Sequence, residues 1–339
     1  NSIRKGMSKF EGSRIREMRE RFVTGATSDS QIAEEVAQTL WDQIEAFAGY
    51  GFNAGHALSY AIPSYQMAWL KTHYPAEFML ARLRAGGGYH TSSVNIAEAR
   101  QLGILVYGPH ANFSRSGFSL SVSRGEGRSM KYEVESDQPL QPSHFILYTG
   151  LGRVKDLRRS TIQAIIEARN ERPFSDVDDF VRRVPCREKE LQHLIKCGAL
   201  DGLGASRNAM LGLKHTENQM SLFGAETAAV DAEPDTPEQN CAWEIELLGM
   251  PFSVRPQELL DEEGTVPIAD LAQMAGRRVK TIGWKLPSYT GGKGFYISDG
   301  EGLILAWDKV NRPPRSWEPA VFVGEWKKDR YGGEWFQVG

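Results

Sequence analysis

Two kinds of side chain in this sequence could carry out chemistry, the thiols and the clustered carboxylates. Three cysteines, Cys186, Cys197 and Cys241, are odd in number and form no Cys-x-x-Cys pair. This argues against a disulfide framework or a zinc site and favours a reducing cytoplasm. The closest carboxylates are those of the run 176–179, Asp-Val-Asp-Asp. The run precedes a helical pattern, so we interpret it as a helix N-cap and expect no metal or other cofactor in this chain.

Length and composition are those of an ordinary soluble protein. The 339 residues fit two or three domains, since a domain has about 100–200 residues. Hydrophobic residues make up 41% and charged residues 24%, as is typical of globular chains. No stretch approaches the roughly 18 consecutive apolar residues of a membrane span, and no signal-peptide core follows the first residues. Because the chain does not begin with Met, we expect it to be a piece of a longer one.

The net charge of −3 hides an uneven distribution. Residues 226–270 carry twelve acidic residues and a single basic one, Arg255, whereas residues 277–339 carry eleven basic and seven acidic residues. Residues 1–30 are also mildly basic, with seven basic and four acidic residues. A polyanion could therefore bind the two ends of the chain while the middle repels it.

Helical periodicity dominates the elements that must position these residues. Apolar residues recur every three or four positions across residues 11–47. A polar break at 24–29 predicts two helices, with Ser28 or Asp29 as the N-cap of the second. Residues 56–83 repeat the pattern, and we expect helix breaks at their two prolines, Pro63 and Pro75.

The rest of the chain alternates between strand and helix patterns. After a short helix at about 92–101, residues 104–107 predict a buried strand, followed by a meander of short strands up to Pro142. Residues 150–215 return to helix. The acidic stretch 225–241 predicts a flexible linker. Four apolar runs with Gly-rich turns between them, from Val279 to Gly324, then predict a small all-β barrel.

Four segments and the C-terminal strands resemble one protein family. They are residues 2–9, 47–57 with 60–79, 147–204, 219–224 and 279–339. The run 47–57, Phe-Ala-Gly-Tyr-Gly-Phe-Asn-Ala-Gly-His-Ala, and its continuation are the most specific, since chance does not produce a match of that length. On these segments the chain resembles the C-terminal portion of a bacterial C-family DNA polymerase, of the polymerase III alpha-subunit type.

The resemblance implies that the first two segments belong to polymerase fingers, which hold a deoxynucleoside triphosphate. Positive side chains would neutralise the phosphates, and His and hydroxyl groups would add hydrogen bonds. The implied nucleotide-binding residues are Arg4, Lys5, Lys9, Asn53, His56, Ser59 and Tyr60. By themselves, Arg4 and Lys5 favour a solvated charge pair and His56 a helix cap. The family usually has Lys-Ser where this chain has Ala54-Gly55, so we expect nucleotide affinity or fidelity to differ.

Residues 147–204 resemble the paired helix-hairpin-helix of the family. Such hairpins bind DNA without reading its sequence, because hairpin glycines expose backbone N–H groups to a phosphate and a neighbouring cation adds charge. The implied DNA-binding residues are Gly150, Gly152, Arg153 and Lys155. A purely structural hairpin remains the alternative.

Residues 219–224 resemble the peptide by which bacterial polymerases hold the sliding clamp. Leu222 and Phe223 would fill a preformed apolar pocket, and Gln219 would hydrogen-bond at its rim. The alternative is that the Leu-Phe pair belongs to a hydrophobic core.

The C-terminal barrel resembles an OB-fold, which binds single strands by stacking bases on aromatic side chains in a basic groove. The candidates there are Lys285, Lys293 and Trp307. Seven aromatic residues are available, Trp284, Tyr289, Tyr296, Trp307, Trp326, Tyr331 and Trp335. About half of them must be core, and sequence alternation does not say which half.

The expected fold is multidomain α+β, with helical fingers and helix-hairpin-helix region followed by a small barrel. The expected domains are 1–142, fingers; 143–224, tandem helix-hairpin-helix with clamp-binding peptide; 225–270, acidic linker and connecting helices; and 271–339, OB-fold. The expected function is to bind primer–template DNA, nucleotide and sliding clamp in replication or translesion synthesis. The resemblance places the catalytic palm, with its Mg²⁺ ions, upstream, so this chain alone should not polymerise. The alternative is a stand-alone adaptor for DNA and clamp.

Overall fold

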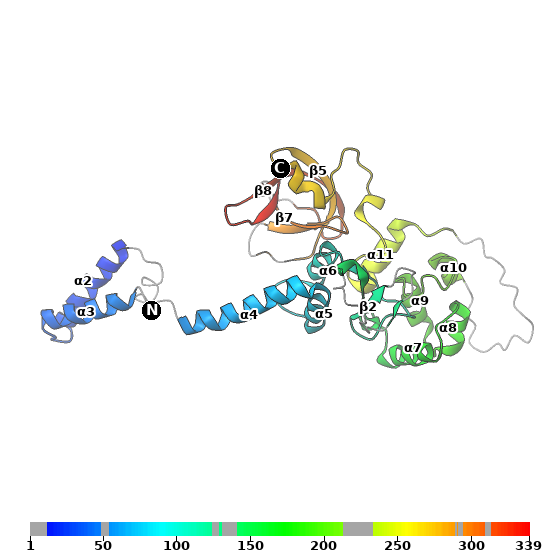
Figure 1. Ribbon diagram of the computed structural model, residues 1–339, viewed down its shortest axis with the longest axis horizontal. Helices are drawn as coiled ribbons and strands as arrows, with labels where there is room; N and C mark the ends of the chain where they lie inside the picture. The colour runs from blue at the N-terminus through cyan, green and yellow to red at the C-terminus, as the bar shows by residue number, and fades with distance from the viewer. Residues whose placement is uncertain are drawn as a thin grey trace, which may run out of the picture. The chain divides into compact units, whose positions relative to one another are not determined.

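The computed structural model describes residues 12–48, 54–123, 129–130, 141–212, 233–288, 290, 294–308 and 313–339, and Figure 1 traces the chain through them. The chain divides into two compact units, residues 1–72 and 73–339, each with its own packing. None of the described helices combines the length and the apolar character needed to cross a membrane.

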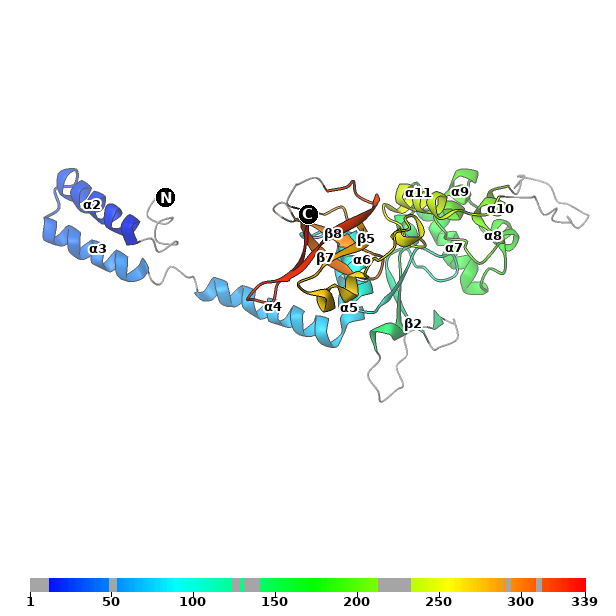
Figure 2. The same ribbon diagram turned by 90° about the horizontal axis from the view of Figure 1, so that it is seen from above.

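The first unit begins with a pair of helices, α2 (Gly12–Ser28) and α3 (Glu34–Ala48), which lie side by side in Figure 2. The rings of Phe22 and Trp41 meet between them at 5.5 Å, and Ala37 is buried beside them. The predicted N-cap is wrong, because Ser28 is still part of α2. Its hydroxyl donates to the carbonyl of Thr24 at 2.8 Å, so it serves its own helix.

Helix α4 (Ala54–His73) runs without a break through Pro63, so the predicted interruption there is wrong. A proline removes one helical N–H donor, here the partner of the Ser59 carbonyl. Ser59 is exposed, and water can therefore satisfy that carbonyl. The predicted break at Pro75 is confirmed, because α5 (Pro75–Ala85) begins with that proline.

The second unit opens with α5, α6 (Ser92–Gln101) and a four-stranded sheet. Its strands are β1 (Leu105–Tyr107), β2 (Ser119–Ser123), β3 (Ser129–Met130) and β4 (Phe145–Tyr148), in the order β1-β4-β2-β3. A one-turn helix, η1 (Pro142–His144), precedes β4. The predicted strand is only half buried: Val106 points into the core, whereas its two neighbours are exposed. Strand β1 lies parallel to β4, with Tyr107 opposite Tyr148.

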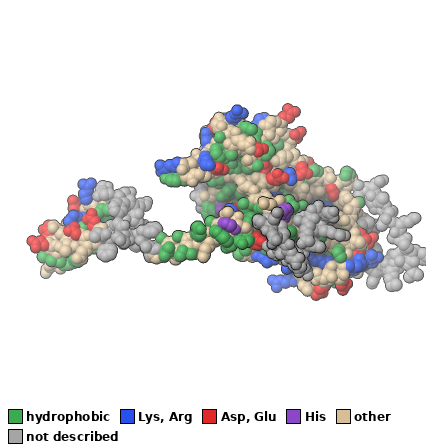
Figure 3. Space-filling view, viewed as in Figure 1, with side chains coloured by type: hydrophobic (Ala, Val, Ile, Leu, Met, Phe, Trp, Pro, Cys, Tyr) green, Lys and Arg blue, Asp and Glu red, His purple; other side chains and the backbone are tan. Residues whose placement is uncertain are grey.

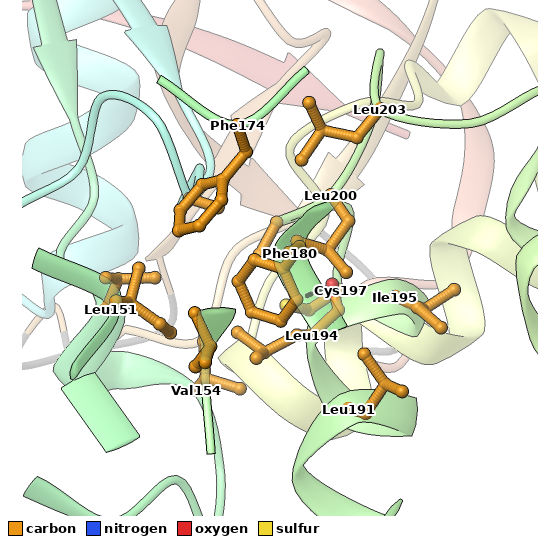
Figure 4. Packing of buried hydrophobic residues seen from close by; sticks show 14 of the residues in the cluster. Leu151, Val154, Phe174, Phe180, Leu191, Leu194, Ile195, Cys197, Leu200 and Leu203 are labelled. Atoms are coloured by element: carbon orange, nitrogen blue, oxygen red, sulfur yellow. Dashed lines mark hydrogen bonds between the residues drawn. The ribbon is translucent and has the colours of Figure 1, made fainter. Parts of the chain in front are cut away.

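The helical part of the second unit is built on one hydrophobic core. Its elements are η2 (Leu151–Arg153), α7 (Arg159–Glu171), α8 (Val177–Arg183), α9 (Glu188–Lys196), α10 (Arg207–Gly212) and α11 (Pro237–Leu248). Figure 4 shows Leu151 and Val154 pointing toward the ring of Phe180 and the side chain of Leu194. These residues come from η2 and the turn after it, α8 and α9, so one hydrophobic core packs these elements together.

Helix α11 begins inside the stretch predicted to be linker. Thr236 caps it by accepting from the Gln239 N–H, Pro237 stands at its first position, and Gly249 ends it at a φ of 81°. Leu247 and Leu248 are buried in the same core as α9. The linker prediction is therefore wrong for residues 233–241, and residues 225–232 lie outside the described ranges.

Two 3-10 segments, the one-turn η3 (Pro256–Glu258) and the seven-residue η4 (Ile268–Met274), lead into a closed barrel. Its strands are β5 (Arg278–Lys285), β6 (Gly294–Ser298), β7 (Leu303–Asp308), β8 (Pro319–Lys328) and β9 (Glu334–Val338), in the order β5-β6-β7-β9-β8. Its core contains Phe295, Ile297, Phe322 and Phe336. The predicted α+β fold with a small barrel is confirmed, and β9 is a strand that the sequence did not predict.

Candidate nucleic-acid interface

The first hairpin, residues 150–171, consists of η2, a turn and α7. Val154 and Ile162 anchor its two arms in the core. The turn between them contains no glycine. Asp156 adopts the left-handed conformation there, with a φ of 61°, and its carboxylate accepts from Lys189 of α9 at 2.8 Å. The first hairpin is thereby tied to α9.

Gly150 and Gly152 have a packing role that the sequence did not reveal. A Cβ atom on Gly150 would lie 2.3 Å from the carbonyl oxygen of Ser116, and one on Gly152 would lie 2.9 Å from it. The Gly152 N–H donates to that same oxygen at 2.9 Å. The expectation that this N–H is exposed to a phosphate is therefore wrong. Both glycines allow the hairpin to approach the segment before β2.

Glu190 of α9 fixes the turn of the first hairpin through hydrogen bonds to residues at the start of α7. Its carboxylate, 4% exposed, accepts from the backbone N–H of Arg158 at 2.9 Å and from the Arg158 guanidinium at 3.0 and 2.6 Å. It also accepts from the Thr161 hydroxyl at 2.8 Å. Burial opposes ionisation of this carboxyl, but the hydrogen bonds outweigh it and lower the pKa of Glu190 to about 2. The carboxylate is thus charged at neutral pH and orders the start of α7.

The outer side of the turn carries positive charge. Lys155, Arg159 and Ser160 are all exposed. Lys155 lies 3.8 Å from Glu246, which is also exposed, so water screens this pair. The first intrahelical bond of α7 is donated by Ile162 to Arg158, which leaves the N–H groups of residues 159–161 without an intrahelical acceptor. A helix start beside cations is a favourable position for a phosphate.

Arg153 and Lys155 have different surroundings. The guanidinium of Arg153 stacks over the Phe118 ring at 5.5 Å, and burial lowers its pKa. Its Nε has no hydrogen-bond partner among the described residues. Arg153 therefore packs inward, while Lys155 points its ammonium group to solvent. The sequence did not single out Arg159 or Ser160, although both stand directly before the apolar pattern of α7.

The second hairpin, residues 188–212, consists of α9, a turn and α10. Its arginine, Arg207, is 3% exposed and pairs with Asp201 at 2.7 Å and with Glu244 at 2.9 Å. Glu244 in turn accepts from Ser253 and from the Phe252 N–H. Burial opposes the charge of Arg207, but the bonds and charges of both carboxylates raise its pKa. The Arg207 guanidinium is therefore buried and paired, and it does not face solvent.

The start of α10 is already occupied by a carboxylate. Asp235, which lies just before α11, accepts from the N–H groups of Arg207 and Asn208 at 2.8 and 2.9 Å. The Asn208 amide also donates to the carbonyl of Glu233 at 3.2 Å. The end of the acidic stretch is thus fixed to the second hairpin.

The barrel does not bring its candidates together. Lys285 pairs with Ile297, which points into the barrel core, whereas Trp307 pairs with Gly294. Side chains of opposed residues share a face and alternate along each strand. Gly294 and Ile297 are three positions apart on β6, so they face opposite sides of the sheet. Their partners Trp307 and Lys285 therefore lie on opposite faces as well. Lys293 lies outside the described residues.

The outer face of the barrel carries the candidate Trp307 together with Trp335, which the sequence did not select. Trp307 pairs with Gln337 of β9, and Trp335, two residues earlier, pairs with Lys327 of β8. By the same alternation, these side chains share the outer face with Trp307, which is 38% exposed. Trp284, in contrast, is buried outside the barrel in a cluster with Val94 of α6.

The nucleotide-binding and clamp-binding candidates are only partly placed. His56, Ser59 and Tyr60 lie exposed on the first two turns of α4. The Tyr60 ring contacts the His56 ring at 4.6 Å, and the Ser59 hydroxyl donates to the His56 carbonyl at 2.7 Å. Outside the described residues lie Arg4, Lys5, Lys9, Asn53, Gln219, Leu222 and Phe223.

Within the described ranges, no three His, Cys, Asp or Glu side chains gather as metal ligands would. The run 176–179 caps α8, as predicted: the Asp176 carboxylate accepts from the Asp179 N–H at 2.7 Å. Asp179 itself is bound by the guanidinium groups of Arg172 and Arg183, at 2.6 and 2.9 Å. These carboxylates are therefore used in holding α7 to α8.

Comparison with known proteins agrees with this geometry. A family model described as a helix-hairpin-helix motif matches residues 103–210. The DNA polymerase III subunit alpha of Helicobacter pylori strain J99 is 35% identical over 242 residues, which are 66% of this chain and 19% of that protein. The proteins of the same name from Thermus aquaticus and Bacillus subtilis are 37% and 32% identical, over 62% and 83% of this chain.

These matches cover 16% to 25% of the relatives' length, so this chain spans about a fifth of the proteins it resembles. The resemblance predicted from the sequence is confirmed along most of the chain. The chain is a homologue of a portion of the DNA polymerase III alpha subunits, and the helix-hairpin-helix family model matches its middle.

Proposed function

We propose that this chain is the DNA-holding portion of an alpha-type subunit of DNA polymerase III. It would bind primer–template DNA by its phosphates, without reading the sequence, during replication or translesion synthesis. The observation that carries the proposal is the first hairpin. Lys155 and Arg159 stand exposed beside N–H groups of α7 that have no intrahelical acceptor.

Charge supports the same surface. On the face drawn in Figure 3, Lys and Arg side chains (blue) lie over the hairpin region around α7, with acidic side chains (red) between them. A phosphate at the start of α7 would accept from backbone N–H groups and from the Ser160 hydroxyl, while Arg159 supplies charge. Backbone donors contact phosphate in the same way at any base pair, which explains binding without sequence preference.

Salt titration of duplex binding tests the proposal. Fluorescence anisotropy of labelled duplexes should give an affinity that falls steeply with salt, since each neutralised phosphate adds about 0.9 to the slope of log K against log[salt]. Lys155→Glu and Arg159→Ala should weaken all duplexes alike, and Arg159→Ala should reduce the slope by about 1. Arg182→Ala, a change at an exposed arginine of α8 outside the two basic ends of the chain, is the matched control. A salt-independent affinity, or unchanged binding in both hairpin variants, would refute the proposal.

The helical first unit would contribute contacts to the incoming nucleotide. His56, Ser59 and Tyr60 present imidazole and hydroxyl groups on two adjacent turns of one helix, which suits hydrogen bonding to a triphosphate. Titration with a fluorescent deoxynucleoside triphosphate should show weaker binding for His56→Ala than for Leu58→Ala, a change at another exposed residue of α4. Equal nucleotide affinities of the two variants would refute a role of α4 in nucleotide binding.

The segment from Gln219 to Phe223 would hold the sliding clamp. Leu222 and Phe223 are the proposed anchors, and hot-spot anchors typically cost about 2 kcal/mol or more each when truncated. The double change Leu222→Ala with Phe223→Ala should therefore abolish most clamp affinity and leave the melting temperature unchanged. A destabilised double variant that still binds clamp would show that the pair is core instead.

A further inference from the structure

Three aromatic rings form a nearly parallel series at the edge of the sheet. The Tyr148 ring stands between Tyr107 and Phe113, with centroids 5.9 and 5.5 Å away and both interplanar angles at 28°. Tyr148 is 7% exposed, whereas Tyr107 and Phe113 are 50% and 40% exposed. Two large apolar rings are thus held at the surface by a buried one, a costly arrangement unless something stacks on them.

A pocket of about 260 Å³ opens beside these rings. The three rings and Phe252 give it apolar lining, and Arg207 and Glu244 also line it. Those two side chains are 3% and 1% exposed and pair with each other. The pocket is therefore lined in part by the buried ion pair that joins the second hairpin to α11.

His110 and Ser253 of the pocket are already engaged in hydrogen bonds. The Asn112 N–H donates to Nδ1 of His110 at 3.0 Å, so the Nε2–H of the neutral ring donates to the Asp201 carbonyl at 3.0 Å. Burial lowers the pKa of His110 and keeps the ring neutral. The Ser253 hydroxyl donates to Glu244. A ligand therefore meets flat apolar faces, with few free donors or acceptors that could read its identity.

The pocket is continuous with the first hairpin. The N–H and hydroxyl of Thr149 both donate to the Tyr107 carbonyl, at 3.0 and 2.9 Å, and Gly150 of the hairpin follows directly. Positive charge borders the other side, because Arg169 donates to the Ala111 carbonyl at 2.8 Å. Burial and the charge of Arg115 lower the pKa of Arg169.

We propose that this pocket takes an unpaired nucleobase of the DNA that the first hairpin holds, stacked on Tyr107 and Phe113. Aromatic rings between cationic side chains are the general means of binding single-stranded nucleotides without sequence preference. The positive border favours a polyanion that carries bases over an aromatic side chain of a protein partner. The proposal rests on DNA binding by the first hairpin.

The test compares two duplexes that differ by one unpaired nucleotide. One duplex carries 2-aminopurine in a single-nucleotide bulge, and the other carries it in a base pair. The whole chain should bind the bulged duplex about 10-fold more tightly and quench its fluorescence, because the unpaired base stacks on the two exposed rings.

The double variant Tyr107→Leu with Phe113→Leu keeps apolar bulk and removes the rings. It should lose the preference for the bulge and the quenching, while its affinity for the paired duplex stays unchanged. Tyr65→Leu, a change at an aromatic residue of α4 that is 72% exposed, should behave as wild type.

Each other outcome overturns the proposal in a distinguishable way. Equal affinity for the two duplexes rejects the base pocket and leaves hairpin binding intact. Failure to bind either duplex rejects DNA binding by the hairpin and the pocket with it. Bulge preference without quenching, or an equal loss of both duplexes in the double variant, shows that the rings do not stack on a base.

Discussion

The two hairpins both contain a cationic side chain and a helix start, but the surroundings of these features are opposite. In the first, the cations Lys155 and Arg159 face solvent and the start of α7 is exposed. In the second, the cation Arg207 is buried between two carboxylates, and Asp235 occupies the start of α10. The difference teaches that a helix-hairpin-helix pattern alone does not assign DNA contact. The partners of its cations and of its helix starts decide between a binding surface and a structural joint.

The largest expected loss of stability comes from a change in the second hairpin, the structural joint. Arg207→Ala leaves Glu244 buried and unpaired, and removal of one partner of a buried ion pair typically costs about 3–5 kcal/mol. Urea unfolding should show this loss for Arg207→Ala and a change within about 0.5 kcal/mol for the exposed Arg159→Ala. Similar losses in both variants would contradict the contrast between the hairpins.

Acid should weaken the first hairpin through Glu190. Its folded pKa of about 2 lies below the ordinary value of 4.5, so its contribution is complete above pH 4.5 and is lost as the pH falls toward 2. The shift corresponds to stability on the order of 3 kcal/mol. The free energy of unfolding of Glu190→Gln should be lower than that of wild type at pH 7, and the gap should narrow below pH 4.5. A gap that is constant with pH would show that Glu190 gains nothing from its charge.

Gly150→Ala tests the close packing of the first hairpin. The added Cβ would meet the Ser116 carbonyl at 2.3 Å, and overpacking of this kind costs about 1–3 kcal/mol. Thermal unfolding should report the loss. The matched control is Gly117→Ala, where an added Cβ meets nothing within 4 Å. Equal melting temperatures for the two variants would remove the packing role of Gly150.

The smallest expected effect concerns the carboxylate on the second hairpin. Asp235→Ala leaves two N–H groups of α10 without their acceptor, and loss of a helix cap costs about 1 kcal/mol. Denaturant unfolding should show this decrease, and Asp235→Asn should restore part of it because an amide oxygen still accepts. No difference between Ala and Asn would mean that the cap contributes little.

Local signals predicted much of this fold. The helical pattern predicted for residues 150–215 contains α7, and Pro75 marked the start of α5. The signals for α11 were also present, in Thr236, Pro237 and Gly249, but the acidic composition around them favoured a linker. Strand β9 was missed because its pairing with β7 and β8 is set by closure of the barrel, which no short window contains.

The candidate site was harder to predict, because the partners of each residue come from distant segments. Of the two cations predicted to contact DNA, Lys155 is exposed, whereas Arg153 turns onto Phe118, 35 positions earlier in the chain. The role of Gly150 depends on Ser116, from the segment before β2. The position of Arg159 matters because α7 begins there without an intrahelical acceptor for its first N–H groups, and a short stretch of sequence does not contain that information.

The buried pair of Arg207 and Glu244 also fixes how α11 is aligned along its neighbours. Leu247 and Leu248 are apolar and could slide along α9 with modest change in contact. A shift of one helical turn, about 5.4 Å, would instead carry Glu244 away from Arg207 and from the Phe252 N–H. A charge left alone in the interior is far costlier than a displaced methyl group. The pair therefore fixes the register of α11 against α9, because one alignment of the two helices is much more stable than the alignments shifted by a turn.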